Sequence, residues 1–140
     1  MSYQNKTIFE KIRELPELRT FFQTVEKTSI SKQLKGEKLF TVFAPNDNAY
    51  AKIPQTTLTE ILKEPVKLRD LTGYHLVAGK FLFKDLTKPV AVQSLQGENL
   101  FLNPEKFYTV NNVRVIKPDI ECQNGAIHII YKVLNPYERV

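Results

Sequence analysis

The sequence predicts one α+β domain, and three observations support this. Its first third places apolar residues at i, i+3, i+4 and i+7, which is the spacing of one buried helical face. From Tyr74 onward the apolar period changes towards two, as is typical of strands. Helices come first and strands later, and this order favours α+β over alternating βαβ units. A length of 140 residues suits a single domain, and 42% hydrophobic residues can form a real core.

The helical part begins with a capping-box pattern. Thr7 precedes Glu10 by three residues, so the two side chains can each satisfy a backbone N–H of the first turn. Pro16 suits the first turn of a second helical segment. The buried face of that segment is expected to consist of Leu18, Phe21, Phe22 and Val25. A short third helix is expected from Ile30 to Leu34, closed by Gly36.

A buried strand over residues 39–44 then runs into Pro45. Asn46 and Asp47 follow, and their side chains are typical helix N-caps because they accept hydrogen bonds from unpaired backbone N–H groups. Another helix is expected over residues 54–62. It ends at Pro65, and one or two further helical turns follow over residues 66–71.

Strands dominate the second half, and two hairpins are predicted within it. The expected strands are residues 90–92, 100–102, 107–110, 113–116 and 126–134. Asn111–Asn112 and Asn124–Gly125 are the expected two-residue loops, since Asn and Gly tolerate positive φ.

A loop at Asn124–Gly125 would pair Glu121 with His128 and would place Cys122 on the opposite face of the strand pair. The carboxylate would then raise the pKa of His128. Two interpretations follow from this pairing: a pH-sensitive pair, or an ordinary cross-strand contact.

Composition restricts the classes of partner. The formal charge is +5, but basic and acidic residues are interspersed along the whole chain. Because nucleic-acid binders concentrate positive charge in a patch or stripe, we expect a solvated surface and no nucleic-acid partner. An acidic polymer or an anionic lipid surface is the alternative. The single cysteine, Cys122, allows no internal disulfide.

The sequence also bears on membranes and export. No stretch has the roughly 18 apolar residues of a membrane span. The polar residues 1–6 lack the apolar core of a signal peptide, so the protein would be cytoplasmic if Met1 is its native start.

Three segments together resemble the fasciclin-like (FAS1) domain family. They are TVFAPNDNAY at residues 41–50, LTGYHLV at residues 71–77 and NGAIHIIYKVLNP at residues 124–136. Their order and spacing fit one domain over residues 7–136, with a polar tail at 1–6 and a C-terminal tail at 137–140. The resemblance implies a helical layer packed on a β-wedge or sandwich of antiparallel-rich strands.

The resemblance also implies a function. It suggests a non-catalytic module of the cell surface, extracellular matrix or periplasm that contacts a surface protein or polysaccharide. In some animal members, the places occupied here by Tyr74–His75 and Asp119–Ile120 take part in partner binding. Asp119 and Ile120 follow Pro118, so we expect them in an extended, exposed segment. Tyr74, His75 and His128 are candidates for the same surface, although the residues themselves favour a structural role for each.

We find no pattern that indicates catalysis. The sequence contains no phosphate-binding glycine loop, zinc-protease histidine pair or paired cysteines, and we expect no metal or cofactor. The alternative function is a carrier of an apolar small molecule such as a carotenoid or lipid. It rests on relatives that bind carotenoids and on the many Phe and Leu residues near the helical layer.

Overall fold

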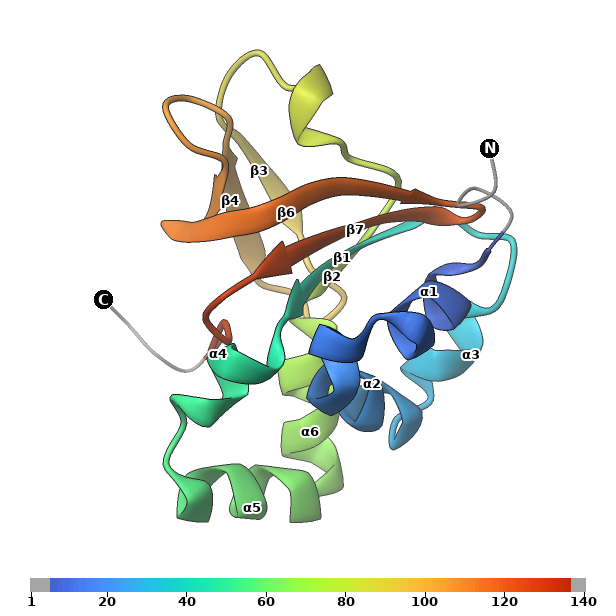
Figure 1. Cartoon of the computed structure of the whole chain (residues 1–140), viewed down its shortest axis with the longest axis vertical. Coiled ribbons are helices and arrows are strands. Elements are labelled where there is room, and N and C mark those ends of the chain that lie inside the picture. Colours follow the sequence, from blue (N-terminus) through green and yellow to red (C-terminus); the bar gives the residue numbers. More distant parts are fainter. Residues whose placement is uncertain (1–5, 137–140) are drawn as a thin grey trace.

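The structure is a computed structural model that describes residues 6–136 (Figure 1). The helices are α1 (Ile8–Glu14), η2 (Pro16–Leu18), α2 (Arg19–Glu26), α3 (Ile30–Leu34), α4 (Asp47–Ala51), α5 (Gln55–Lys63), α6 (Pro65–Gly73) and η3 (Phe83–Asp85). The strands are β1 (Phe40–Pro45), β2 (Leu76–Ala78), β3 (Val90–Gln93), β4 (Asn99–Asn103), β5 (Thr109–Val110), β6 (Val113–Cys122) and β7 (Gly125–Ile130). The α+β prediction is therefore confirmed. The expected tails, apart from Lys6, lie outside the described residues.

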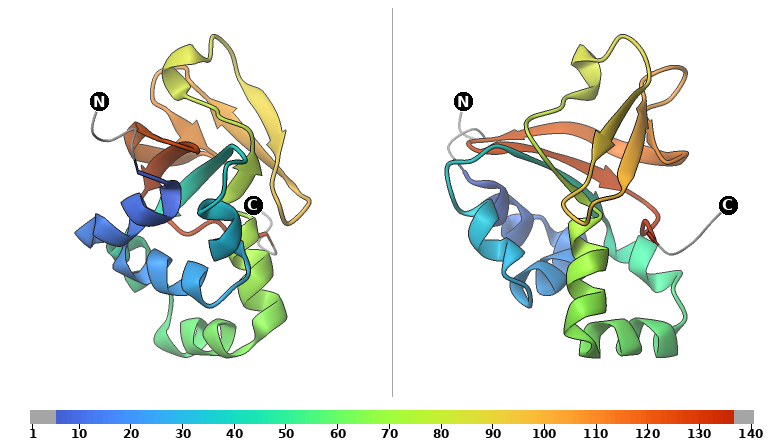
Figure 2. Two further views of the ribbon diagram at one scale, coloured as in Figure 1. Left: turned by 90° about the vertical axis from the view of Figure 1, so that its right-hand side faces the viewer. Right: turned by 180° about the vertical axis from the view of Figure 1, so that it is seen from behind.

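The strands form one sheet in the order β2-β1-β7-β6-β5-β4-β3. The β1–β7 pair is parallel and the other pairs are antiparallel. Within β6 the pairing to β7 shifts register between Val115 and Ile120, which marks β-bulges. Helices α1 to α6 cover one side of β1 and β7, and the β3–β4 hairpin lies beyond the other side (Figures 1 and 2).

Strand β7 is the centre of the fold, and all six of its residues are buried. Ile127 and Ile129 belong to the apolar core under the helices, which also contains Phe21 and Leu34. Ile130 faces a second apolar core, with Leu100 and Leu102 from β4. A strand buried on both faces reads as a continuous apolar run, and this one stands between two layers.

Local signals set several of the element ends. The capping box of α1 is present, since the Thr7 hydroxyl accepts from Glu10 N–H and the Glu10 carboxylate accepts from Thr7 N–H. Asn46 caps α4 by accepting from Ala49 N–H at 2.9 Å. Asp47 lies inside that helix, and its carboxylate accepts from Thr20 N–H at 2.8 Å. This last bond holds α4 against α2.

The two hairpin predictions differ in outcome. Val110 pairs with Val113, so Asn111–Asn112 is the expected two-residue loop, with φ of 50° and 66°. The second loop is shifted by one residue, because Cys122 pairs with Gly125. The last strand also ends at Ile130 instead of continuing to residue 134. Residues 131–136 form an irregular segment, which we call the C-terminal segment.

The register of the second hairpin contradicts the expected pairing of Glu121 with His128. Glu121 pairs with Ala126, and its carboxylate binds Lys80 and Lys84. The loop shifts because the Asn124 side chain turns inward. It accepts from Ile8 N–H at 2.8 Å and donates to Leu34 O, also at 2.8 Å. These bonds tie the loop to α1 and α3, and an isolated hairpin would have no such partners.

Within residues 6–136, no helix combines the length and apolar character needed to cross a membrane.

Candidate functional site

The residues predicted to contact a partner occupy two places on either side of β1. Tyr74 and His75 follow the last turn of α6, and their rings contact each other edge to face. Asp119 and Ile120 lie in the irregular part of β6, and His128 lies opposite them in β7. Phe43 of β1 separates the two places: its N–H donates to His75 O, and its ring stacks on His128.

His75 is a buried link between α6 and the C-terminal segment. Its Nδ1 lies 2.8 Å from Leu71 O, and its Nε2 accepts from Leu134 N–H at 2.9 Å. Since a carbonyl can only accept, Nδ1 carries the proton and the ring is neutral. Burial lowers the pKa of His75 to about 4. The residue is 1% exposed, so it cannot offer its ring to a partner.

Tyr74 is largely buried, but its hydroxyl reaches the surface region beside the β5–β6 turn. The hydroxyl accepts from Asn111 Nδ2 at 2.9 Å. The same Asn111 side chain accepts from Phe101 N–H at 2.9 Å, so it joins Tyr74 to strand β4. The Tyr74 ring itself packs in the second core.

His128 and Asp119 form a second buried link. Asp119 N–H donates to His128 Nδ1 at 2.9 Å, and His128 Nε2 donates to Phe81 O at 2.8 Å. Because Nδ1 accepts, this ring is also neutral, and the 3.6 Å approach of the Asp119 carboxylate is not an ion pair. Burial lowers the pKa of His128, and this outweighs the Phe81 carbonyl and Asp119, which act in the other direction. The prediction of a raised pKa is therefore wrong.

The expected exposure of Asp119 and Ile120 is also wrong. The Asp119 carboxylate is only 14% exposed, and it accepts from Phe83 N–H at 2.7 Å and from Lys84 N–H at 3.1 Å. Asp119 has φ of 60°, which the bulged strand requires. Ile120 is half-buried against the core under the helices. The Asp119 carboxylate thus ties strand β6 to the first two residues of η3 and does not project from the surface.

Two kinds of catalytic group can be checked in the described residues: a metal cluster and a reactive cysteine. No group of three or more His, Cys, Asp or Glu side chains in residues 6–136 is placed to hold a metal ion. Burial raises the pKa of Cys122 to about 12, so its thiol is not a nucleophile near neutral pH. Cys122 packs in the core under the helices, whereas His128 contacts Phe43 and Phe83 on the other side of β7. The expected separation of these two residues is confirmed.

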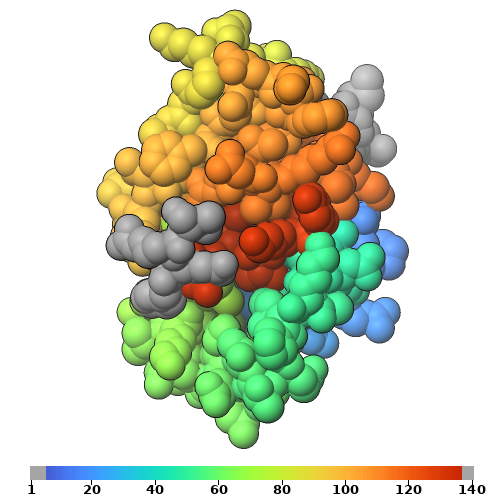
Figure 3. Space-filling view, turned by 90° about the vertical axis from the view of Figure 1, so that its left-hand side faces the viewer, coloured from blue at the N-terminus to red at the C-terminus, as the bar shows by residue number. Residues whose placement is uncertain are grey.

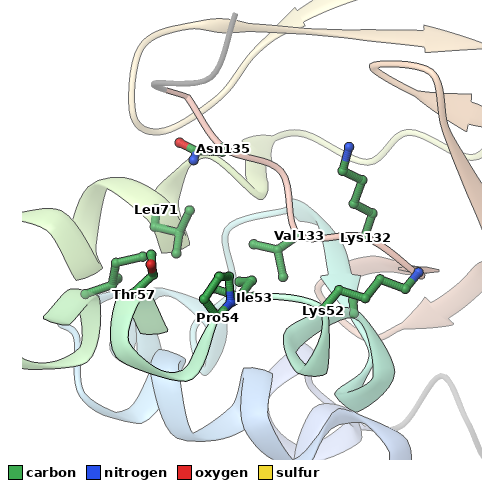
Figure 4. A pocket seen from close by; sticks show the side chains of 10 residues that line it. Lys52, Ile53, Pro54, Thr57, Leu71, Lys132, Val133 and Asn135 are labelled. Carbon is green, nitrogen blue, oxygen red and sulfur yellow. The ribbon is translucent and has the colours of Figure 1, made fainter. Parts of the chain in front are cut away.

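Sequence reasoning missed an apolar groove between the helices and the C-terminal segment. Figure 3 shows the face on which this segment, in red, meets α4 and α5 in green. Figure 4 shows Lys52 and Lys132 near one end and Leu71 and Thr57 near the other. One cavity here encloses about 270 Å³, and a neighbouring one of about 460 Å³ shares Thr57, Ile61, Leu71 and Asn135 with it. We call the two together the helix groove. Its walls come from segments far apart in the sequence, so no local pattern could reveal it.

A second depression, which we call the hairpin hollow, lies beside Tyr74. It encloses about 520 Å³ and is lined by Tyr74, Phe101, Pro136 and residues 93 and 97–99 of the β3–β4 hairpin. The Phe101 ring is 60% exposed. One sequence signal does point to Phe101: in the run Leu100–Phe101–Leu102 the outward position is apolar, where a half-buried strand usually has a polar residue.

Comparisons with known proteins agree with this architecture. The family model described as "Fasciclin domain" matches residues 16–136. The uncharacterized protein sll1735 of Synechocystis sp. is 37% identical over 115 residues, which cover 82% of this chain and 86% of that protein. The transforming growth factor-beta-induced protein ig-h3 of Sus scrofa is 29% identical over 136 residues, which are 93% of this chain but only 20% of that protein.

A solved structure shows the same fold. It is a FAS1 domain pair from the insect cell adhesion molecule Fasciclin I, with a TM-score of 0.74 and 23% sequence identity. The match covers 93% of this chain and 51% of that chain, so the present fold corresponds to about half of the pair. The family model covers most of the chain, and the solved FAS1 structure has the same fold. The protein therefore belongs to the fasciclin domain family.

Proposed function

We propose that this protein is a non-catalytic binding module for adhesion or matrix contacts, with a surface protein or a polysaccharide as its partner. The observation that carries the proposal is the fasciclin domain match over residues 16–136. One solved relative is described as a cell adhesion molecule. We place the module at the cell surface, in the extracellular matrix or in the periplasm on the same basis.

The chemistry of the described residues supports binding without catalysis. The chain has two histidines and one cysteine. Both nitrogens of each histidine ring are hydrogen-bonded to the backbone, and neither ring can exchange a proton with a substrate without breaking such a bond. The cysteine is buried and protonated. A cysteine nucleophile with a histidine base is therefore not formed by these residues.

We infer different roles for the five predicted partner-binding residues. Tyr74 lines two surface depressions, one of which is the hairpin hollow. Surface segments are held in place by the hydrogen bonds of His75, Asp119 and His128. Ile120, the neighbour of Asp119, packs against the core under the helices. A partner would thus contact the segments that these residues position. The wide distribution of the +5 charge also argues against a nucleic-acid partner.

The proposal is tested by saturable binding. The purified chain should bind intact cells, isolated cell-wall polysaccharide or isolated surface proteins, and the binding should reach a plateau with rising protein concentration. A control protein of similar size and net charge, together with salt of about 0.5 M, removes adsorption that depends on charge alone. If no fraction shows saturable binding under these conditions, the proposed function is wrong.

A second candidate function is the transport of an apolar small molecule, and the helix groove favours it. The groove has an apolar surface from Ile53, Ile61, Leu71 and Val133. The larger of its two cavities, about 460 Å³, falls within the ~300–1,000 Å³ of common ligand sites. Absorbance and mass spectrometry of protein from its native host test this idea. A carrier retains a coloured or lipid ligand through purification, and a variant with Ile61→Arg loses that ligand. The matched variant Ile116→Arg, at an exposed position on β6, should retain it.

A further inference from the structure

We propose that the hairpin hollow is a subsite for a neutral saccharide. The assignment rests on the proposed binding function and names the class of partner that this surface would recognise. It is carried by one exposed aromatic ring, a set of polar side chains around it and the local charge.

The Phe101 ring is placed as a flat platform. Leu100 and Leu102, its neighbours in β4, are buried, whereas Phe101 is 60% exposed. Its cross-strand partner in β3 is Ala91, whose methyl group is too small to cover an aromatic face. Removing exposed apolar surface from water is favourable, so a ligand that covers this ring is stabilised. Pyranose rings have apolar C–H faces that pack on aromatic rings in this way.

Polar groups surround the platform on the same face. Asn99 precedes Phe101 by two residues and therefore points to the same side of β4. Gln93 lies directly opposite Asn99 in the β3–β4 pair, and its Nε2 is held by Gly97 O at 2.9 Å. The Gln93 side-chain oxygen remains as an acceptor, and the Asn99 amide supplies donors and an acceptor. Sugar hydroxyls both donate and accept, so such amides suit them.

Tyr74 also lines the hollow, and its hydroxyl is held in one position. Its side chain is more than nine-tenths buried, and its hydroxyl oxygen accepts from Asn111 Nδ2. That bond sets the position of the oxygen and leaves the hydroxyl proton to donate. A buried, oriented donor discriminates between ligands better than a mobile surface group, because its partner must meet it in one place.

The charge of the hollow selects a neutral ligand. Glu98 is its one charged lining residue within the described part of the chain, although the protein as a whole is basic. A carboxylate at this position repels the acidic groups of an anionic polymer. The polar lining is also unsuited to an acyl chain, which would leave the amides unpaired.

The experiment is amide NMR with three soluble probes: cellohexaose, chitohexaose and polygalacturonate. The two neutral probes should shift the amide signals of residues 93, 97–99 and 101, and polygalacturonate should not. Phe101→Ala should weaken the affinity for the better neutral probe by about tenfold. Phe107→Ala is the matched control, because Phe107 is 53% exposed but lies outside the hollow, and it should change affinity by less than about twofold.

Tyr74→Phe removes only the hydroxyl and should weaken binding by about fivefold, with the shifted signals unchanged in position. Melting curves confirm that each variant is folded before its affinity is measured. The saccharide subsite is overturned if neither neutral probe shifts the hollow, if Phe101→Ala and Phe107→Ala behave alike, or if polygalacturonate shifts the hollow more strongly.

Binding to intact cells, measured in parallel, separates the two levels of the proposal. If Phe101→Ala leaves the affinity for cells unchanged, the subsite is ruled out as the contact to cells and the adhesion function stays in place. Loss of all saturable cell binding by the unaltered protein rules out the proposed function itself.

Discussion

The Nε2 atom of His75 accepts a hydrogen bond from the backbone N–H of Leu134, 59 residues further along the chain. Through this bond the end of α6 holds the C-terminal segment, which forms one wall of the helix groove. The bond exists only while Nε2 is unprotonated. A histidine that accepts from a buried N–H therefore makes the stability of this part of the fold depend on pH.

The first prediction is that the protein loses stability as pH falls from about 6.5 towards 4. The pKa of His75 is about 4 in the folded chain and near 6.5 when unfolded. Between these values the unfolded chain binds more protons, so the free energy of unfolding rises with pH and falls on acidification. His75 alone accounts for a loss of about 3 kcal/mol at pH 4. Urea denaturation at several pH values measures this.

A control separates the histidines from the carboxylates. The pKa values of Glu10, Glu14 and Glu121 are lowered by their hydrogen bonds, so their contribution is lost only below about 4.5. His128, whose pKa is also lowered by burial, acts in the same direction as His75. Between pH 6.5 and 4.5, His75→Gln should therefore show a clearly smaller slope than the unaltered chain. Constant stability across this range would contradict the prediction.

The second prediction concerns Asp119. Replacing it by Ala leaves the N–H groups of Phe83 and Lys84 without their acceptors, and it places Ala at φ of 60°. We expect a loss of about 2–4 kcal/mol and faster hydrogen exchange at those two amides. Asp119→Asn should cost less, since Asn keeps one acceptor and tolerates positive φ. The control Asp85→Ala, at an exposed position in η3, should cost less than about 0.5 kcal/mol. Equal effects at positions 119 and 85 would refute this role.

Features fixed by neighbouring residues could be predicted from the sequence. The Thr7 capping box, the Asn111–Asn112 loop and the helical face containing Phe21 each depend on contacts within a few positions. Tyr74 and His75 could be singled out by their family motif. However, the Tyr74 partner Asn111 lies 37 residues away, and Leu134, one of the two partners of His75, lies 59 residues away. Those partners become neighbours only in the assembled fold.

The failures at Asp119 and His128 share one physical cause. Pro118 and the simple alternation of a strand suggest an extended, exposed segment, but the bulges in β6 turn Asp119 towards η3. The loop shift by one residue follows from the contacts of Asn124 with α1 and α3, and it removes Glu121 from His128. In each place a long-range hydrogen bond outweighs the local strand pattern. The helix groove could not be predicted because its walls come from segments that are far apart in the sequence.

The third prediction concerns Gly125, where β7 begins beside β1. A Cβ atom at this position would lie 1.7 Å from Phe40 O, and φ is 144°. Because Phe40 pairs with Gly125 in the central parallel ladder, neither strand can move away cheaply. Gly125→Ala should lower the free energy of unfolding by more than about 4 kcal/mol or prevent folding.

Gly97→Ala is the matched control. Its φ is 118°, but no atom lies within 4 Å of the added Cβ, so only backbone strain of about 1–3 kcal/mol applies. Circular dichroism and urea denaturation compare the two, and similar stability of both variants would contradict the argument.

The fourth prediction is that the thiol of Cys122 does not react in the folded protein. The residue is 3% exposed, and burial raises its pKa to about 12, so almost no thiolate exists near pH 8. We expect a disulfide reagent such as 5,5′-dithiobis(2-nitrobenzoate) to label the native chain at least about 100-fold more slowly than the urea-unfolded chain. Since Cys122 is the sole cysteine, the released chromophore reports this site alone.

Labelling of the native chain should also accelerate in Gly125→Ala if that variant opens the β6–β7 hairpin, because Cys122 pairs directly with Gly125. Equal rates for the native and unfolded chains would show that the thiol is accessible, and Cys122 would then have to be reconsidered as a reactive group.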